Sequence, residues 1–338
     1  MSGKVKWGVM GVANIALKKV IPAMQRGQSA EIVAIASRDL SRAERAASEL
    51  GIAKAYGSYE ALLADAEIEA VYNPLPNHLH VPWSIKAAEA GKHVLSEKPI
   101  GLSVAEAKEL ARARDRAGVK IEEAFMVRTH PQWIKTRDLV RAGRIGDARS
   151  VMSHFSYFNL DPRNIRNTVE YGGGGLMDIG CYSINISRFV FGEEPRRVFA
   201  LIEHDPNTGV DRLTSALLDF PSGQAIFTCS TQLVPYQRAH IFGTRGRIEV
   251  EIPFNAPPYR PCRIFIDDGS DLSGQSVETI ELETVDQYTI QGDLFSQAIR
   301  DGSEVAVPLE DSIKNMAVIE ALTRSAVSGQ WEVPESEA

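Results

Sequence analysis

The sequence is poor in cysteine and lacks long apolar runs. Cys181, Cys229 and Cys262 are too few and too scattered for a disulfide framework or a C-x-x-C zinc site. No run of about 18 apolar residues is present, so we expect no membrane span. The start, MSGKVKWGVMG, has no apolar stretch behind a basic one, so we expect no signal peptide. These absences predict a cytoplasmic protein with free thiols.

Basic residues are fewer than acidic ones, and no metal-ligand pattern is present. The formal net charge is −7, whereas nucleic-acid-binding proteins are usually basic. The seven histidines show no metal-ligand spacing, so we predict no metal site. With 44% hydrophobic and 24% charged residues, the composition is that of an ordinary globular enzyme. Membrane, nucleic-acid and disulfide-scaffold functions are therefore disfavoured.

The 338 residues predict two domains with different architectures. Up to about residue 120, strands such as KVKWGVMG and EIVAIASRD alternate with helical segments, which is typical of a doubly wound parallel α/β sheet. After about residue 150, alternating strands dominate and predict an α+β domain with a large, mostly antiparallel open sheet. We place the domains at residues 1–125 and 126–338, with late helices near 288–300 and 309–327 that can pack back on the first domain.

The first strand ends in a glycine-containing loop, WGVMGVANIA, that opens a helix. A glycine turn before a helix N-terminus is suited to binding a pyrophosphate. The full G-x-G-x-x-G is absent, because Met10 and Ala13 replace two glycines. The candidate cofactor-binding residues in this loop are Gly8, Gly11, Val12, Ala13, Asn14 and Ile15.

The end of the second strand indicates which dinucleotide is preferred. An NAD site usually has an acid here, but this chain has Ser37 and Arg38, with Arg42 shortly after. A hydroxyl and two guanidinium groups suit a 2′-phosphate and therefore NADP. Asp39 leaves two alternatives, because it can cap the following helix or contact the ribose. That helix, SRAERAASELG, has Ser41 and Glu44 in capping-box spacing.

Two later segments carry candidate chemistry. LSEKPIG (95–101) follows a parallel strand, where ligands collect in open α/β sheets, and it contains Lys98. GGGGLMDIGCYSIN (172–185) places Asp178 and Tyr182 four residues apart, on one face of a helix expected over 175–192.

The chain resembles the Gfo/Idh/MocA oxidoreductases over essentially its whole length. Its D-x-G-x-Y motif, Asp178 to Tyr182, is similar to the branch of glucose–fructose oxidoreductase, NADP-dependent D-xylose dehydrogenase and dimeric dihydrodiol dehydrogenase. The resemblance implies a Rossmann domain followed by an open-sheet domain whose faces often pair in a homodimer. It rests on the segments GVMGVANIA, ASRD, YNPLPNHLH, GKHVLSEKP, EAFMVRTHPQ and GGGGLMDIGCYSIN.

The resemblance also implies roles for individual residues. Lys98, Tyr182 and Asp178 are implied to be catalytic. Lys98 is also implied to touch the nicotinamide ribose, and Glu97 to lie beneath the nicotinamide. A free tyrosine has a pKa of about 10, which a nearby ammonium group lowers, so the implied neighbours Lys98 and Tyr182 are a candidate proton-transfer pair in which either can be the base. Other residues implied to lie near the cofactor are Pro74, Asn77, His80 and Arg128. From the residues themselves, Asn164, Arg166 and Tyr288 are candidates for substrate binding, while the first two can equally anchor a loop.

The predicted function is NADP-dependent oxidation of an aldose, such as xylose or glucose, at C1 to the lactone. One alternative keeps NADP(H) bound and oxidises one sugar while reducing another. A second alternative is a trans-dihydrodiol dehydrogenase or dicarbonyl reductase. A third, outside the enzymes, is an NADP-binding sensor, which the joint presence of Lys98, Asp178 and Tyr182 disfavours.

Overall fold

The computed structural model describes residues 3–335 and divides into two compact units. One unit contains the chain up to Met126 together with Asp286–Ile313, and the other contains Val127–Val285 together with the chain from Lys314 onward. Each unit is built around its own β-sheet. Within the described residues, no helix is long and apolar enough to cross a membrane.

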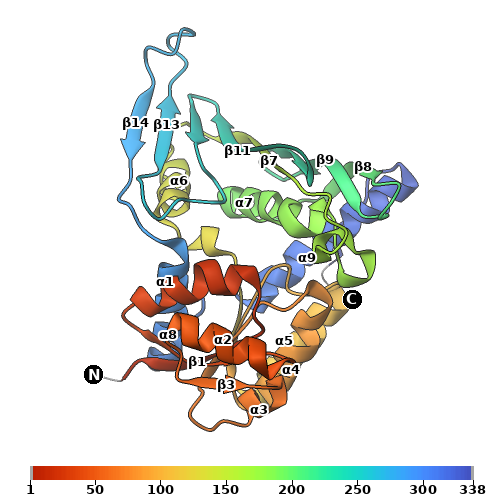
Figure 1. Cartoon of the computed structure of the whole chain (residues 1–338). Helices are drawn as coiled ribbons and strands as arrows, with labels where there is room; N and C mark the ends of the chain where they lie inside the picture. The colour runs from red at the N-terminus through yellow and green to blue at the C-terminus, as the bar shows by residue number, and fades with distance from the viewer. Residues whose placement is uncertain (1–2, 336–338) are drawn as a thin grey trace. The chain divides into compact units, whose positions relative to one another are not determined.

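The first unit contains the parallel sheet that the alternating pattern predicts (Figure 1). Its order is β3-β2-β1-β4-β5-β6, and every neighbouring pair is parallel. The order reverses between β1 and β4, so the carboxyl ends of these strands form the crevice where such sheets bind ligands. The strands are β1 (Val5–Met10), β2 (Ala30–Ala36), β3 (Lys54–Tyr56), β4 (Ala70–Asn73), β5 (His93–Ser96) and β6 (Ile121–Glu123).

Helices cover both faces of this sheet, which explains why its strands are apolar on both sides. Trp7 and Val9 of β1 pack into one core cluster, with Phe295 of the late helix α8. Met10 and Val71 belong to a second cluster. The helices are α1 (Ile21–Arg26), α2 (Leu40–Leu50), α3 (Tyr59–Leu63), α4 (His80–Glu89), α5 (Val104–Ala117) and α8 (Gln287–Asp301).

The second unit contains an eight-stranded sheet in the order β14-β13-β12-β11-β7-β10-β9-β8. All neighbouring pairs are antiparallel except β7 and β10, so the expected mostly antiparallel sheet is confirmed. The strands are β7 (Ala148–Phe158), β8 (Arg197–His204), β9 (Asp211–Asp219), β10 (Gln224–Ser230), β11 (Gln232–Gly243), β12 (Arg247–Val250), β13 (Arg263–Asp267) and β14 (Glu278–Glu281).

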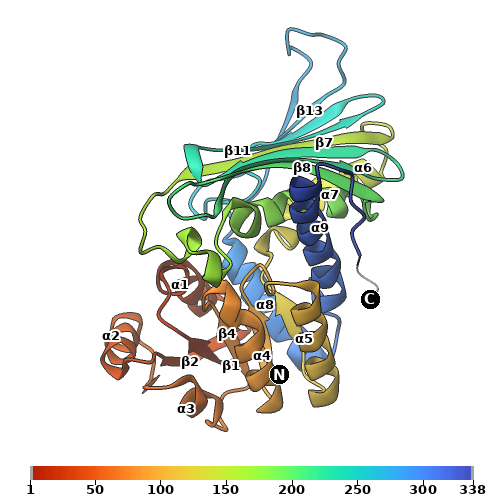
Figure 2. The same ribbon diagram turned by 90° about the vertical axis from the view of Figure 1, so that its right-hand side faces the viewer.

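One face of the second sheet carries helices, and the other lies open (Figure 2). Alternation along β10 shows the two faces, since Ala225 and Phe227 are buried while Ile226 is 38% exposed. The helix predicted over 175–192 is present as the π-helical η6 (Leu176–Gly180) followed by α7 (Cys181–Phe191). The other helices of this unit are α6 (Pro131–Arg141) and the larger part of α9 (Leu309–Ser328).

Candidate active site

The glycine loop lies at the carboxyl end of β1, at the point where the strand order reverses. Gly11 has φ of +104°, a conformation that favours glycine, and its N–H donates to the Ala36 carbonyl at 2.8 Å. Residues 14–26 then form one continuous helix, which includes the π-helical turn η1 (Ala16–Val20). The first N–H groups of a helix have no partner within it, so this turn fits a pyrophosphate.

Gly8 lies close to a neighbouring helix of the same unit. It lies inside β1, and a Cβ there would come within 2.8 Å of the Leu62 side chain on α3. Gly8 therefore allows close packing of α3 on the strand. Of the predicted loop residues, Gly11, Val12, Ala13, Asn14 and Ile15 remain at the end of the strand and the start of the helix.

The polar residues after β2 support a preference for a phosphate. Ser37 is buried directly after the strand, whereas Arg38 and Arg42 are exposed. Asp39 caps α2, because its Oδ1 accepts bonds from the Ser41 N–H at 3.0 Å and the Ser41 hydroxyl at 2.7 Å. These bonds lower the pKa of Asp39. The capping box expected from Ser41 and Glu44 is therefore wrong, since the helix begins one residue before Ser41.

The turn after β4 holds the segment that follows β5. His80 is buried, its Nδ1 lies 2.7 Å from the Pro99 carbonyl, and its Nε2 lies 2.6 Å from the Leu75 carbonyl. Burial lowers the pKa of His80 to about 4. The neutral ring can donate to only one of these two carbonyls, and its close packing between them links this turn to Pro99. Of the other expected residues, Pro74 is buried and Asn77 begins the short helical turn η2 (Asn77–Leu79).

Lys98 stands on a tightly held backbone at the carboxyl end of β5. The Glu97 N–H donates to the Asn73 carbonyl at 3.0 Å, and the Tyr72 hydroxyl donates to the Glu97 carboxylate at 2.7 Å. The following Ile100 N–H donates to the buried Glu123 carboxylate at 2.8 Å. Lys98 is thus carried by a segment anchored on β4 and β6 rather than by a free loop.

Tyr288, at the start of α8, belongs to the same unit as Lys98. Its N–H is capped by the Asp286 carboxylate at 3.0 Å. Burial raises the pKa of its phenol, and the carboxylates of Glu97 and Asp286 add to this effect. The structure therefore brings Tyr288 into the electrostatic neighbourhood of Glu97, which the sequence separation concealed.

In the second unit, one helix carries both Asp178 and Tyr182. Asp178 lies in the π-helical turn η6, a type of turn that is frequent at functional sites. Tyr182 lies in the first turn of α7, with its ring centroid 5.6 Å from that of Phe254 and 6.1 Å from that of Phe155. Aromatic packing on two sides restricts the ring and so directs the phenol.

Asp178 is held by two groups on the same carboxylate oxygen. The Tyr157 hydroxyl donates to its Oδ2 at 2.6 Å, and Arg166 Nε lies 2.9 Å from the same atom. Burial and the Asp178 charge both raise the pKa of Tyr157, which stays a phenol that donates. Arg166, predicted as a substrate-binding or loop-anchoring residue, forms an ion pair with Asp178, and Tyr157 had not been predicted.

Two other expected site residues make local contacts in the second unit. The Asn164 side chain accepts a bond from the Arg166 N–H at 3.0 Å and caps the turn η4 (Ile165–Asn167). Asn164 thus anchors the loop that carries Arg166. The Arg128 guanidinium lies 4.6 Å from the Phe189 ring centroid, and its Nη1 donates to the Asn185 side chain at 3.5 Å. Arg128 is therefore oriented by α7.

The described residues contain no group of three or more potential metal ligands among His, Cys, Asp and Glu. Cys181, Cys229 and Cys262 are buried and form no disulfide within the described residues.

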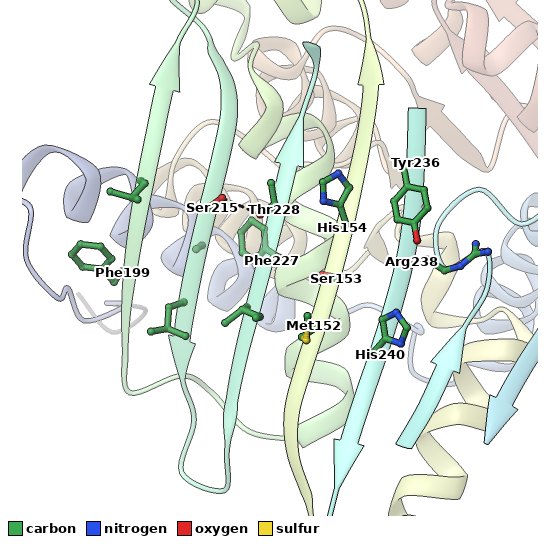
Figure 3. A pocket seen from close by; sticks show the side chains of 14 residues that line it. Met152, Ser153, His154, Phe199, Ser215, Phe227, Thr228, Tyr236, Arg238 and His240 are labelled. Carbon is green, nitrogen blue, oxygen red and sulfur yellow. Dashed lines mark hydrogen bonds between the residues drawn. The ribbon is translucent and has the colours of Figure 1, made fainter. Parts of the chain in front are cut away.

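The open face of the second sheet forms a separate feature (Figure 3). A shallow hollow of about 560 Å³ lies over β7 to β11, with Tyr236, Arg238 and His240 along one strand. We call this surface the outer face and define it by its exposed apolar residues Met152, Leu201, Ile226 and Tyr236. Exposed apolar surface of this kind marks interaction sites.

Both halves of the chain match one oxidoreductase family. Residues 5–125 match the "Oxidoreductase family, NAD-binding Rossmann fold", and residues 133–249 match the "GFO/IDH/MocA C-terminal domain". The chain belongs to the Gfo/Idh/MocA oxidoreductases. The resemblance noted in the sequence is thereby confirmed.

Two similar proteins cover nearly the whole chain. An uncharacterized oxidoreductase of Rhizobium meliloti is 51% identical over 97% of this chain and 98% of its own. An NADP(+)-dependent D-xylose 1-dehydrogenase of Haloferax volcanii is 39% identical over 96% of this chain and 98% of its own.

Two solved structures share this fold closely. A 3-ketoreductase of Actinomadura kijaniata, solved with NADP and TDP-benzene, has a TM-score of 0.89 and 30% identity, covering 96% of this chain and 98% of its own. An aldose–aldose oxidoreductase of Caulobacter crescentus, solved with glycerol, has a TM-score of 0.89 and 27% identity over 98% of this chain and 99% of its own.

Proposed function

We propose that this oxidoreductase uses NADP to oxidise an aldose of the xylose or glucose type at C1, giving the lactone. The observation that carries the proposal is the position of the Asp178 carboxylate, which Tyr157 and Arg166 hold from other segments. Asp178 and Tyr182 lie on the same helix. A fixed carboxylate beside a phenol suits a substrate with several hydroxyl groups. The 39% identity to a xylose dehydrogenase supports the choice of an aldose.

The residues after β2 support NADP as the cofactor. Arg38 and Arg42 remain exposed for a 2′-phosphate, and the Asp39 carboxylate that could have held a ribose hydroxyl is bonded to Ser41. Gly11 and the helix start fit the pyrophosphate, as described above. When bound, NADP supplies the hydride acceptor. The proposal agrees with the NADP named for two similar proteins.

In the proposed reaction, the C1–H bond breaks with its electron pair as hydride while the C1 hydroxyl gives up its proton. Tyr182 takes that proton as a phenolate, and C1 becomes the lactone carbonyl. Lys98 has the complementary part in this proposal, since an ammonium group beside a phenol favours the phenolate that accepts the proton. Asp178 accepts hydrogen bonds from sugar hydroxyls and orients C1. In the reverse direction, Tyr182 returns the proton.

The test compares Tyr182→Phe and Lys98→Met with matched substitutions at exposed positions, Tyr259→Phe and Lys135→Met. We expect the first pair to lower kcat for aldose oxidation by about 100-fold or more, because a proton acceptor and its activating charge are lost. The NADP Kd of this pair should stay within about twofold of the wild type. The control pair should keep both kcat and the NADP Kd within about twofold. Unchanged kcat in Tyr182→Phe would refute the assignment.

A second candidate function is sugar–sugar oxidoreduction with NADP(H) retained between turnovers. The similarity to the Caulobacter aldose–aldose oxidoreductase favours it. Purified protein would then oxidise one sugar in a single burst without added NADP, and a second sugar would reverse the absorbance change. A dehydrogenase that exchanges its cofactor would instead need free NADP in every turnover.

We also propose that two copies of the chain pair through the outer face. Leu201 is 69% exposed and Ile226 is 38% exposed, and both lie on this face. The double variant Leu201→Glu and Ile226→Glu should run as a monomer in light scattering, because it places charges in an apolar interface. Val327→Glu, at an apolar residue 87% exposed on α9, is the control and should leave the mass unchanged. A dimer that survives the double change would refute this interface.

A further inference from the structure

A buried carboxylate that the proposed reaction does not use lies against the helix of Asp178 and Tyr182. Asp211 is the first residue of β9, and its Oδ2 accepts a hydrogen bond from the Leu176 N–H at 2.6 Å. The Thr214 hydroxyl donates to the same oxygen at 3.1 Å. Leu176 is the first residue of η6, so the carboxylate joins the edge of the sheet to the start of the helix.

The run of four glycines makes room for this carboxylate. A Cβ on Gly174 would lie 1.8 Å from Asp211 Oδ1, and Gly174 has φ of +111°. A Cβ on Gly175 would lie 3.3 Å from Asp211 Oδ2. Any side chain at Gly174 would therefore displace Asp211, so the absence of a side chain at this glycine leaves the space that the carboxylate occupies.

Burying this carboxylate costs stability, which argues that it has a use. The residue is only partly buried as a whole, but its carboxyl group is enclosed, and this burial raises its pKa to about 7. The bonds from Leu176 and Thr214 oppose that rise without cancelling it. Strongly shifted carboxyl groups cluster at functional sites, where other demands outweigh stability.

The same turn leads directly to the proposed catalytic residues. The Asp178 N–H donates to the Gly174 carbonyl at 3.0 Å, so Asp178 is bonded to the residue against which Asp211 packs. Tyr182 follows four residues later on the same helix. A shift of the first turn would therefore move Asp178 directly and Tyr182 with it.

We propose that Asp211 is a positioning residue, which fixes the first turn of the helix carrying Asp178 and Tyr182 and thereby sets the orientation of these two side chains. This inference rests on the proposed function, in which Asp178 and Tyr182 act on the substrate. Asp211 itself touches neither substrate nor cofactor in this account.

The first test measures catalysis in Asp211→Ala and Asp211→Asn. We expect the alanine variant to lower kcat by about 10- to 100-fold, the cost of misplacing catalytic groups by about 1 Å. Its NADP Kd should stay within about twofold, because the glycine loop and the residues after β2 are untouched. Asparagine keeps an oxygen that can accept the Leu176 N–H, so it should recover at least about a third of the lost activity.

Asp205→Asn is the matched control. Asp205 is a buried residue of the same unit, and its carboxylate accepts bonds from the Asn207 and Thr208 N–H groups in the loop between β8 and β9 and from the Gln232 side chain on β11, none of which lies on the helix of Asp178. This variant should keep kcat within about twofold. A second control uses the Tyr182→Phe background, in which Asp211→Ala should reduce the residual rate by less than about threefold, because residues that act as a unit are not additive.

Amide hydrogen exchange separates this inference from the substrate assignment, because it needs no substrate. In Asp211→Ala, residues 176–182 should exchange faster than in the wild type, while α6 and α9 stay unchanged. If the wild type oxidises no aldose but this local change occurs, the sugar assignment fails and the positioning of the helix is supported. Unchanged exchange in residues 176–182, or unchanged kcat in a folded and active Asp211→Ala protein, would overturn the inference.

Discussion

The stability of the protein should depend on pH through Asp211, and Asp211→Asn should remove that dependence. The pKa of Asp211 in the folded protein is about 7, because burial disfavours the charged form. In the unfolded chain it should be close to about 3.9. Between these values the folded state holds one proton that the unfolded state does not. The contribution of Asp211 to the unfolding free energy is therefore fully present at acid pH, and it is lost as the pH rises toward 7.

The size of the effect follows from the two pKa values. Each pH unit between them removes about 1.4 kcal/mol of unfolding free energy, and the loss levels off above the folded pKa. From about pH 5 to about pH 8, the group should cost the wild type on the order of 2 kcal/mol. Asparagine does not titrate, so the variant escapes this loss. Relative to the wild type, Asp211→Asn should therefore gain about 2 kcal/mol over this interval.

Urea unfolding at the two pH values measures this difference directly. All other titrating groups are common to both proteins and cancel in the comparison. Asp205→Asn is again the control, since hydrogen bonds from Gln232, Asn207 and Thr208 lower the pKa of Asp205 to about 2. The stability that the Asp205 carboxylate contributes is lost only in more acid solution. Asp205→Asn should therefore change the unfolding free energy by the same amount at both pH values. A pH-independent difference between the wild type and Asp211→Asn would refute the reasoning about burial.

Three further variants test the hold on Asp178, the packing of Gly174 and the 2′-phosphate site. Tyr157→Phe removes the hydroxyl that holds Asp178 and should lower kcat/KM for the sugar by about tenfold, with NADP affinity unchanged in a fluorescence titration. Gly174→Ala should lower the unfolding free energy by at least about 2 kcal/mol in urea, because its Cβ would collide with Asp211 and its φ is positive. Arg38→Ala combined with Arg42→Ala should raise the NADP Kd at least about tenfold and leave the NAD Kd within about twofold; equal losses for both cofactors would contradict a 2′-phosphate site.

The sequence was sufficient to predict both sheets and the helix of Asp178 and Tyr182. Alternating strands and helices leave few topologies, so the parallel, doubly wound class of the first sheet followed from general rules. The four-residue spacing of Asp178 and Tyr182 lies within one helix, where local geometry decides which residues are neighbours. Lys98 closely follows an apolar strand, so its place at a strand end could also be predicted from the local sequence.

Contacts between distant strands and loops could not be predicted. Tyr157 is one of several aromatic residues on an alternating strand, and alternation gives its face but not the partner at the end of the strand. In the sequence Asp211 has no local pattern that marks it, because its partner Leu176 lies 35 positions earlier. The cap of α2 was misassigned since Asp39 and Ser41 both suit an N-cap, and only the backbone shows which residue precedes the helix.

Oxidation of an aldose at C1 by exchangeable NADP can be followed by the absorbance of reduced nicotinamide during incubation with xylose or glucose, first without and then with added NADP. We expect sustained growth of the band only when free NADP is present, together with an equal amount of lactone. A burst without added NADP that a second sugar reverses would show that the cofactor stays bound. Absence of any change across a panel of aldoses would contradict oxidation at the sugar C1.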